Sequence, residues 1–373
     1  MVSKFNYSAA HTQPLRVLIT AGGTGGHIFP GIALAHKLSQ QGWSVQWLGT
    51  ANSMEEGLVP KENIPFKGLN FKGVRGKGIK HAARGMWDIL MATFQAVMYI
   101  QKIQPHLIVG FGGYPTLPAL IAAWVLRVPV VLHEANRVLG MANRLAAHWA
   151  KKIAVSFPQT ILHQKKSIVS KMLHTGAPLR EAFEHPVTLP SLRYQQRKGV
   201  LKILVVGGSQ GAVALNQIVP RALSLIPAEI RPKVVHQSGK NNIDTLKQTY
   251  SDFQIEAECV AFIDNILGVY LDVDVIICRA GALTIAELLA VGLPALYVPL
   301  PGAVDQPANA NWCQAEGAGW YMLQPDFTAE ALSARIMSWS REALIEVAET
   351  AFNLGIRNGT ERLVNVCENV VNS

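Results

Sequence analysis

One pattern recurs along the chain: a short apolar run, a glycine-containing turn and then a helical stretch. Its clearest copy spans residues 275–299, where the apolar run Val275–Cys278 precedes a turn at 279–281 and a helix from Ala282 that should stop at Gly292. Small residues in such a turn leave the first N–H groups of the helix open, and the helix dipole favours an anion there. The pattern predicts a β-loop-α-β unit with an anion site, which a diphosphate would fit.

The same plan occurs in both halves of the chain. Segment 15–27 is echoed by 201–211, and segment 107–132 is echoed by 275–297. Parallel strands that alternate with helices form doubly wound sheets, and their ligands lie outside the carboxyl ends of the strands. We therefore expect an α/β protein with two Rossmann-like domains that face an interdomain cleft bordered by the glycine loops.

A chain of 373 residues exceeds one typical hydrophobic core, in agreement with two domains. We place the N-terminal domain at 1–178, with 1–14 as a loose tail, and the second domain at 179–340. Residues 341–373 are expected to form a C-terminal helical segment that could return to the N-terminal domain. The proline-rich and charged stretch 176–198 is interpreted as the linker. No signal peptide or membrane-spanning run is predicted.

Composition and charge restrict the classes of partner and site that this chain can have. The net charge of +9 points to nucleic acid, anionic lipid or a polyanionic substrate. No interleaving of aromatic and basic residues typical of RNA-binding motifs occurs, so no nucleic acid is expected. The four cysteines lie far apart, which predicts neither a zinc site nor a disulfide framework.

The glycine loops do not match the common nucleotide motifs. A dinucleotide-binding fingerprint needs a third glycine, but in the first loop Ile28 occupies that position. The acidic residue that would bind ribose about 20 residues later is missing after both 22–27 and 207–211. A Walker loop is absent as well. A nicotinamide-dependent dehydrogenase is therefore disfavoured, and no cofactor is expected.

Six segments together resemble the motif series of the MurG family of peptidoglycan glycosyltransferases: 22–27, 112–114, 133–136, 207–211, 236–239 and 281–287. The resemblance covers the chain from Leu15 to about Val366. It implies a type B glycosyltransferase fold and an inverting enzyme that moves N-acetylglucosamine from UDP-N-acetylglucosamine to the 4-hydroxyl of N-acetylmuramic acid in lipid I, giving lipid II. It also implies a peripheral protein at the cytoplasmic face of the cell membrane, with roles in cell wall biogenesis, cell shape and cell division.

The resemblance assigns site residues by position. For donor binding they are Thr24, Gly25, Gly26, Asn136, Arg180, Ser209, Ile263, Ala282, Leu283, Thr284, Ile285, Ala286, Glu287 and Gln306; for acceptor binding they are His27, Tyr114 and Glu134. The chain departs from the family pattern at Ala135, Ala177, Asp305 and Pro307, and the last two bear on the loop around Gln306.

Chemistry narrows the catalytic candidates. An inverting transfer needs a base for the acceptor hydroxyl and stabilisation of the departing diphosphate. The helix after Gly281 can do the second without a metal. His27, with a reference pKa of about 6.5, and Glu134 are the candidate bases. Alternatively, His27 holds an anion or caps a helix, Glu134 makes a structural hydrogen bond, and Glu287 only complements a helix N-terminus.

A basic and apolar stretch indicates where a membrane would bind. Six cations, Lys67, Lys72, Arg75, Lys77, Lys80 and Arg84, precede a helix at about 86–103 that carries Trp87 and several large apolar side chains. Such a combination suits an anionic lipid surface. The alternative is an ordinary helix whose apolar stripe, including Ile89, Leu90 and Phe94, faces the sheet.

Three other functions compete with this one. An epimerase of the same nucleotide sugar would share the donor helix but would not need segment 133–136 or a membrane face. Another nucleotide-sugar glycosyltransferase would keep the donor loops and change the first domain. A non-catalytic binding protein would lose the polar residues on the acceptor side, whereas His27, Tyr114 and Glu134 are all present.

Overall fold

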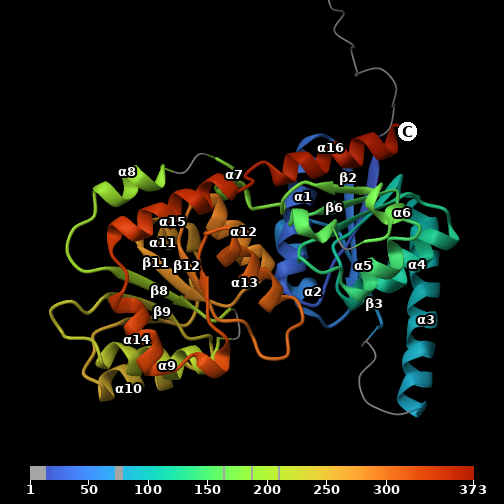
Figure 1. Ribbon diagram of the computed structural model, residues 1–373. Helices are drawn as coiled ribbons and strands as arrows, with labels where there is room; N and C mark the ends of the chain where they lie inside the picture. The colour runs from blue at the N-terminus through green and yellow to red at the C-terminus, as the bar shows by residue number, and fades with distance from the viewer. Residues whose placement is uncertain (1–13, 72–78, 163, 186–187, 209–210) are drawn as a thin grey trace, which may run out of the picture. The chain divides into compact units, whose positions relative to one another are not determined.

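The computed structural model describes residues 14–71, 79–162, 164–185, 188–208 and 211–373 (Figure 1). Ser209, Lys72, Arg75 and Lys77, and all of the expected N-terminal tail except its last residue, lie outside these ranges. The chain divides into two compact units. Unit 1 comprises Met1–Arg180 with Asn358–Ser373, and unit 2 comprises Glu181–Arg357.

Unit 1 is built on a parallel sheet of seven strands, in the order β3-β2-β1-β4-β5-β6-β7. The strand order reverses between β1 and β4, and the glycine loops at 21–27 and 111–114 follow these two strands. Such a switch point is where doubly wound sheets bind ligands. The strands are β1 (Arg16–Thr20), β2 (Ser44–Thr50), β3 (Phe66–Leu69), β4 (Leu107–Gly110), β5 (Val130–Glu134), β6 (Lys152–Val155) and β7 (Met172–His174).

Both faces of this sheet are covered, which explains why its strands are apolar on both sides. On one face Val17 and Ile19 pack with Leu34 and with Leu363, which comes from the far end of the chain. The other face packs against α3 and α4. The helices of unit 1 are α1 (Gly25–Gln40), α2 (Met54–Leu58), α3 (Ile79–Ile103), α4 (Leu117–Val125), α5 (Met141–Ala146), α6 (Lys166–Val169) and α16 (Gly359–Val371).

Helix α3 exposes an apolar face. Trp87, Leu90 and Phe94, spaced three and four residues apart, are 63%, 55% and 61% exposed, while Ala96 and Ile100 are buried against the sheet. Figure 1 shows that the N-terminal half of α3 extends past the other helices of unit 1. The alternative that the stripe faces the sheet is therefore wrong for Leu90 and Phe94. In the part of the chain that the structure describes, no helix has both the length and the apolarity needed to cross a membrane.

Unit 2 repeats the plan with six parallel strands, in the order β10-β9-β8-β11-β12-β13. The strands are β8 (Lys202–Val206), β9 (Lys233–Gln237), β10 (Glu258–Val260), β11 (Val275–Cys278), β12 (Ala295–Tyr297) and β13 (Trp320–Tyr321). The helices are α7 (Glu181–Glu184), α8 (Pro190–Gln195), α9 (Val213–Ser224), α10 (Ile243–Asp252), α11 (Ile266–Asp272), α12 (Ala282–Val291), α13 (Gln306–Ala315), α14 (Ala329–Met337) and α15 (Arg341–Leu354).

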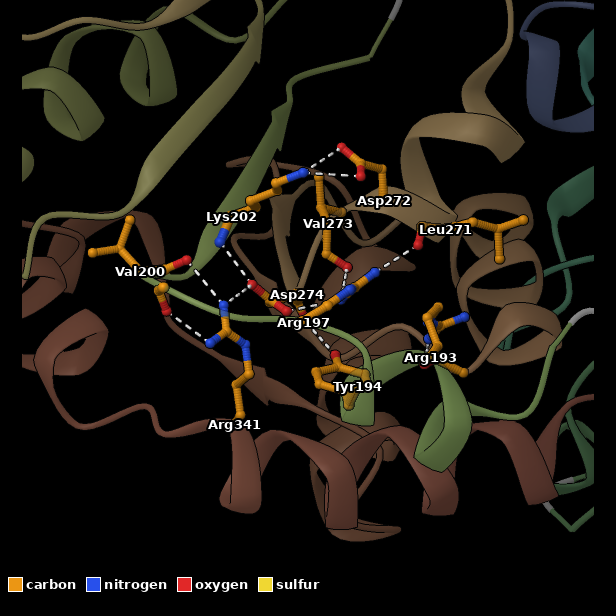
Figure 2. Close-up of polar contacts among 12 residues, drawn as sticks. Arg193, Tyr194, Arg197, Val200, Lys202, Leu271, Asp272, Val273, Asp274 and Arg341 are labelled. Atoms are coloured by element: carbon orange, nitrogen blue, oxygen red, sulfur yellow. Dashed lines mark hydrogen bonds and ion pairs between the residues drawn. The ribbon is translucent and has the colours of Figure 1, made fainter.

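Buried Asp274 joins three segments at the amino ends of β8 and β11 (Figure 2). Its carboxylate accepts hydrogen bonds from Arg197 Nη1 at 2.8 Å, from the Lys202 backbone N–H at 2.7 Å and from Arg341 Nη2 at 3.4 Å. The hydroxyl of Tyr194 donates to the Asp274 carbonyl. A buried carboxylate needs such partners. This network lies at the end of the strands opposite the glycine loops, so its role is to hold unit 2 together.

The ends of unit 2 differ from the expected linker and C-terminal segment. Most of the predicted linker 176–198 belongs to unit 2, where Arg193 of α8 donates to the carbonyls of Val291 and Gly292. Helix α15 packs on α12 in unit 2, and only α16 packs on α1 in unit 1. The linker interpretation failed because a polar, proline-rich segment can still bury individual side chains.

Candidate functional site

The two glycine loops of unit 1 touch each other at the switch point. A Cβ atom at Gly113 would lie 2.3 Å from the carbonyl oxygen of Gly22, and Gly113 has a positive φ of 83°. Only glycine satisfies both conditions. The first loop ends at Thr24, and Gly25 and Gly26 begin α1. The open N–H groups of α1 thus lie beside the second loop.

His27 stands in the first turn of α1 and faces the second loop. Its Nδ1 lies 3.2 Å from Thr24 Oγ1, and its Cδ2 lies 3.6 Å from where a Cβ of Gly112 would be. Tyr114 is 47% exposed, and its ring lies near Gly23. Two of the three acceptor candidates are thus brought together in this unit, on polar and partly accessible loops.

Glu134, the other candidate base, has a different environment. It is 2% exposed at the end of β5, and its carboxylate accepts from the backbone N–H groups of Asn136 at 3.0 Å and Gly140 at 2.9 Å and from Asn143 Nδ2 at 2.9 Å. These bonds fold the segment that follows β5 around the carboxylate. A carboxylate with three donors is a weak proton acceptor, so the geometry favours the structural alternative.

Asn143 lies between this segment and the second glycine loop. It is buried in α5, and a Cβ at Gly112 would lie 3.2 Å from its Nδ2, beside the His27 ring. We did not predict Asn143 from the sequence. The available signal was a polar residue between the buried Ala142 and Ala146 of a short helix. Asn136 is half-buried, and its carbonyl accepts from Thr160 Oγ1 at 3.2 Å; Arg180 is exposed at the end of the first segment of unit 1.

His133, next to Glu134, is fully buried. Its Nε2 lies 3.3 Å from the carbonyl of Gly176 and 3.3 Å from Ser156 Oγ. Burial lowers the pKa of His133 to about 4, the Gly176 hydrogen bond opposes this, and nearby His27 lowers it further. The ring is therefore neutral at physiological pH.

Acid should destabilise the protein through His133. Its folded pKa of about 4 lies below the unfolded value of 6.5, so its contribution is complete above pH 6.5 and is lost as pH falls toward 4. At pH 5 the loss is about 2 kcal/mol of unfolding free energy. We therefore expect that, between pH 7 and pH 5, the free energy of unfolding measured with denaturant falls by about this much more in the parent than in a His133→Gln variant. Equal losses in the two proteins would contradict the buried neutral ring.

The donor candidates of unit 2 follow strands of its parallel sheet. Ile263 comes after β10, the turn 279–281 after β11, and the loop 298–305, which leads to Gln306, after β12. Because carboxyl ends of parallel strands share one edge of the sheet, these segments lie at the same edge. Helix α12 begins at Ala282 and ends at Gly292 in the left-handed conformation, as predicted. Its N-terminus can therefore receive an anion at this edge.

The side chains at the start of α12 differ in accessibility. Leu283, Thr284 and Ala286 are partly exposed, whereas Ala282 and Ile285 are buried. Glu287 is 7% exposed. Ala282 and Ile285 can therefore serve a ligand only through backbone groups, while Thr284 can offer its hydroxyl.

Arg279 and Gln306 fix the loop beside this helix. The Arg279 guanidinium donates to the carbonyls of Val298 at 2.9 Å and Pro299 at 3.2 Å, and to Gln324 Oε1 at 2.9 Å. Gln306 Oε1 accepts from the backbone N–H of Leu300 at 2.9 Å. Pro307 occupies the first turn of α13, where proline is favourable, so the departure at this position is compatible with the local fold. The role of Arg279 was not predicted from the sequence, because Arg279 follows β11 whereas its hydrogen-bond partners follow β12 and β13.

Comparisons with known proteins cover both units. The model of the glycosyltransferase family 28 N-terminal domain matches residues 17–155, and that of the family 28 C-terminal domain matches residues 202–363. A protein of Cupriavidus necator named UDP-N-acetylglucosamine–N-acetylmuramyl-(pentapeptide) pyrophosphoryl-undecaprenol N-acetylglucosamine transferase is 42% identical over 95% of this chain and 98% of its own. The protein of the same name from Paracidovorax citrulli is 43% identical over 96% and 99%.

Solved structures agree in fold. MurG of Acinetobacter baumannii matches with a TM-score of 0.79 at 33% identity, covering 95% of this chain and 100% of its own. A UDP-GlcNAc 2-epimerase from Neisseria meningitidis matches with a TM-score of 0.66 at 15% identity, covering 95% and 100%, which shows a shared fold only. The fold is thus of the glycosyltransferase B type. With both family models matched and relatives above 40% identity along nearly its whole length, the chain belongs to glycosyltransferase family 28, within its MurG family.

Proposed function

We infer that this chain transfers N-acetylglucosamine from UDP-N-acetylglucosamine to the 4-hydroxyl of the N-acetylmuramic acid of lipid I, with inversion, and so forms lipid II. The observation that carries the inference is the identity of 42–43% to transferases of this name, over both units together. The open helix N-terminus at α12 supports it independently, because a leaving diphosphate requires such a group of donors.

We propose that the donor is bound at the strand edge of unit 2. The N-terminus of α12 faces the diphosphate, Thr284 supplies a hydroxyl, and Glu287 accepts from sugar or ribose hydroxyls. Ile263 contacts the base through its backbone, and Gln306 serves the donor sugar while its Oε1 closes the loop at Leu300. Ser209, outside the described residues, and Arg180 complete the proposed donor set, together with Thr24, Gly25, Gly26 and Asn136 of unit 1.

We assign the base to His27 and a positioning role to Glu134. His27 is partly accessible beside the α1 N-terminus and near Tyr114, on the loops that would face the acceptor. Donation from Nδ1–H to Thr24 Oγ1 would leave Nε2 unprotonated, the form that accepts the hydroxyl proton. Glu134 accepts three hydrogen bonds and so holds the segment that carries Asn136 and Asn143.

The reaction itself is the test of this proposal. Purified protein is incubated with radiolabelled UDP-N-acetylglucosamine and lipid I, and the lipid fraction is analysed for labelled lipid II. A parallel incubation with the donor alone detects epimerisation at C2 of the sugar. Labelled lipid II supports the proposal; an epimerised nucleotide sugar without lipid II would replace the transferase with an epimerase.

We further propose that unit 1 binds the cytoplasmic face of the membrane through α3. The face formed by Trp87, Leu90 and Phe94 is exposed, and Arg84 and Lys102 on the same helix are exposed as well. Soluble proteins rarely leave so large an apolar stripe in water without a partner. A lipid-borne acceptor requires an approach to the bilayer, and cations beside an aromatic stripe suit an anionic leaflet.

Replacement of the residues of this face should strongly weaken vesicle binding. Changing Lys77, Lys80 and Arg84 together to Glu should weaken partitioning onto acidic vesicles by about a hundredfold or more, since each cation contributes about 1 kcal/mol. Changing Trp87, Leu90 and Phe94 together to Gln should weaken it as well, because these side chains would no longer enter the headgroup region. Cosedimentation at moderate salt measures this. The control changes Ile230 and Met337, exposed apolar residues of unit 2, to Gln. Donor affinity should stay unchanged throughout, and parent-like sedimentation of both triple variants would place the membrane face elsewhere.

A further inference from the structure

Three consecutive residues at the end of β9 support the third glycine loop, of which Gly207, Gly208 and Gly211 are described. Gln237 Nε2 donates to the carbonyl of Gly208 at 3.2 Å. The carbonyl of Ser238 lies against Gly211, where an added Cβ would be only 1.9 Å from that oxygen. Gly211, with a φ of 76°, leads directly into α9. The Ser238 carbonyl therefore packs against the residue that precedes Ala212, the N-cap of this helix.

The Ser238 carbonyl is itself held from inside the unit. Asn216 of α9 donates to it through Nδ2 at 3.1 Å, and Asn216 Oδ1 lies 3.2 Å from Nε2 of His236. The Nδ1 atom of His236 lies 2.9 Å from the hydroxyl of Tyr250 in α10. His236 is fully buried, so both of its ring nitrogens are used within unit 2.

The Ser238 carbonyl fixes which group donates and which accepts along this series of hydrogen bonds. A carbonyl can only accept, so Asn216 turns its amide nitrogen to Ser238 and its oxygen to His236. His236 must then donate from Nε2–H, and its unprotonated Nδ1 accepts from the Tyr250 hydroxyl. A single neutral tautomer satisfies all three bonds. Burial agrees with this, because it lowers the pKa of His236 to about 3.

We propose that His236 is a positioning residue for the donor site. In its Nε2–H tautomer it accepts a hydrogen bond from Tyr250 and donates one to Asn216, and so holds Asn216 where it donates to the Ser238 carbonyl. Gly211, just before α9, packs against that carbonyl. The proposal rests on the proposed function, since it assumes that UDP binds at this edge of unit 2. The ligand at this part of the edge is a nucleoside diphosphate, which would meet Gly208, Gly211 and the first N–H groups of α9.

Two tyrosine variants separate positioning from stability. Tyr250→Phe removes the hydroxyl that anchors Nδ1 of His236. Tyr194→Phe makes the same chemical change in an equally buried ring of unit 2, at the opposite ends of the strands, where its hydroxyl meets the Asp274 carbonyl (Figure 2). Both should lower the melting temperature by a few degrees. Only Tyr250→Phe should raise the Kd for UDP in calorimetry, by about fivefold, and Asn216→Ala should raise it further.

Nitrogen-15 NMR of histidine reads the tautomer directly, with the His236 signal assigned from its absence in a His236→Gln variant. We expect a neutral ring with the proton on Nε2 that does not titrate between pH 7 and pH 5, and mixed tautomers in Asn216→Ala, where the acceptor of the Nε2 proton is gone. A proton on Nδ1, or titration near pH 6.5, would overturn the proposal. So would equal weakening of UDP binding by the two tyrosine variants. A parent that binds no UDP would instead overturn the proposed function, and the positioning role with it.

Discussion

Replacement of His27 by alanine is expected to lower kcat about a hundredfold or more and to leave UDP binding nearly intact. The reason is that general-base catalysis contributes about 10²- to 10⁴-fold, and the loss of a base affects the transition state more than the ground state. Steady-state kinetics with lipid I, together with calorimetry for UDP, separates the two effects.

His36→Ala is the matched control for His27. His36 lies in the same helix, 3.4 Å from Glu62, and its side chain is 44% exposed to solvent away from the glycine loops. It should keep parental kcat. A His27→Ala enzyme whose kcat is parental and whose KM for lipid I is raised would show that His27 holds the acceptor diphosphate, and the assignment as base would be wrong.

Replacement of Glu287 by alanine should raise the Kd for UDP-N-acetylglucosamine roughly ten- to hundredfold. A carboxylate that accepts hydrogen bonds from a bound sugar or ribose contributes on the order of 1.5–3 kcal/mol. Its position at the first turns of α12, buried to 7% exposure, places it beside the proposed diphosphate site without making it a surface charge. Calorimetry measures the donor affinity.

The competing role of Glu287, complementing the helix N-terminus, makes a different prediction. If Glu287 only complements the helix N-terminus, its replacement by alanine would lower the melting temperature and leave donor affinity unchanged. Glu287→Gln keeps the shape of the side chain and tests whether the charge matters. Glu330→Ala supplies the control, since Glu330 is an acidic residue in the first turn of α14 and has no place in the proposed site. Unchanged affinity in both Glu287 variants would remove this residue from the donor site.

Some site features were predictable because they are local in sequence. Gly292 ends α12 in the left-handed conformation that glycine adopts readily, and the small residues Ala280 and Gly281 precede the helix. His27 and Tyr114 were named from glycine loops that follow strands, and the structure brings these loops together at the switch point between β1 and β4. The two parallel α/β domains followed from the repeated pattern, whereas the strand order came from the structure.

Other features could not be predicted in the same way. The apolar stripe of α3 has the same spacing whether it faces a sheet or a membrane, and only packing showed that Ala96 and Ile100 take the inner face and Phe94 the outer one. Likewise, the sequence left Glu134 as a candidate base. The structure favours a structural role, because Asn143 and two backbone N–H groups donate hydrogen bonds to its carboxylate.

The sequence by itself determined the two parallel α/β sheets, the helix that ends at Gly292 and the membership of the chain in its family, because strand burial, glycine turns and motif spacing are properties of short segments. The tertiary structure decided which polar groups meet. Asp274 bonds Arg341, 67 residues away, and Asn216 joins His236 to Ser238 across two elements. A buried polar group must find a partner, but the partner is chosen by how distant segments pack, and no local pattern encodes that choice.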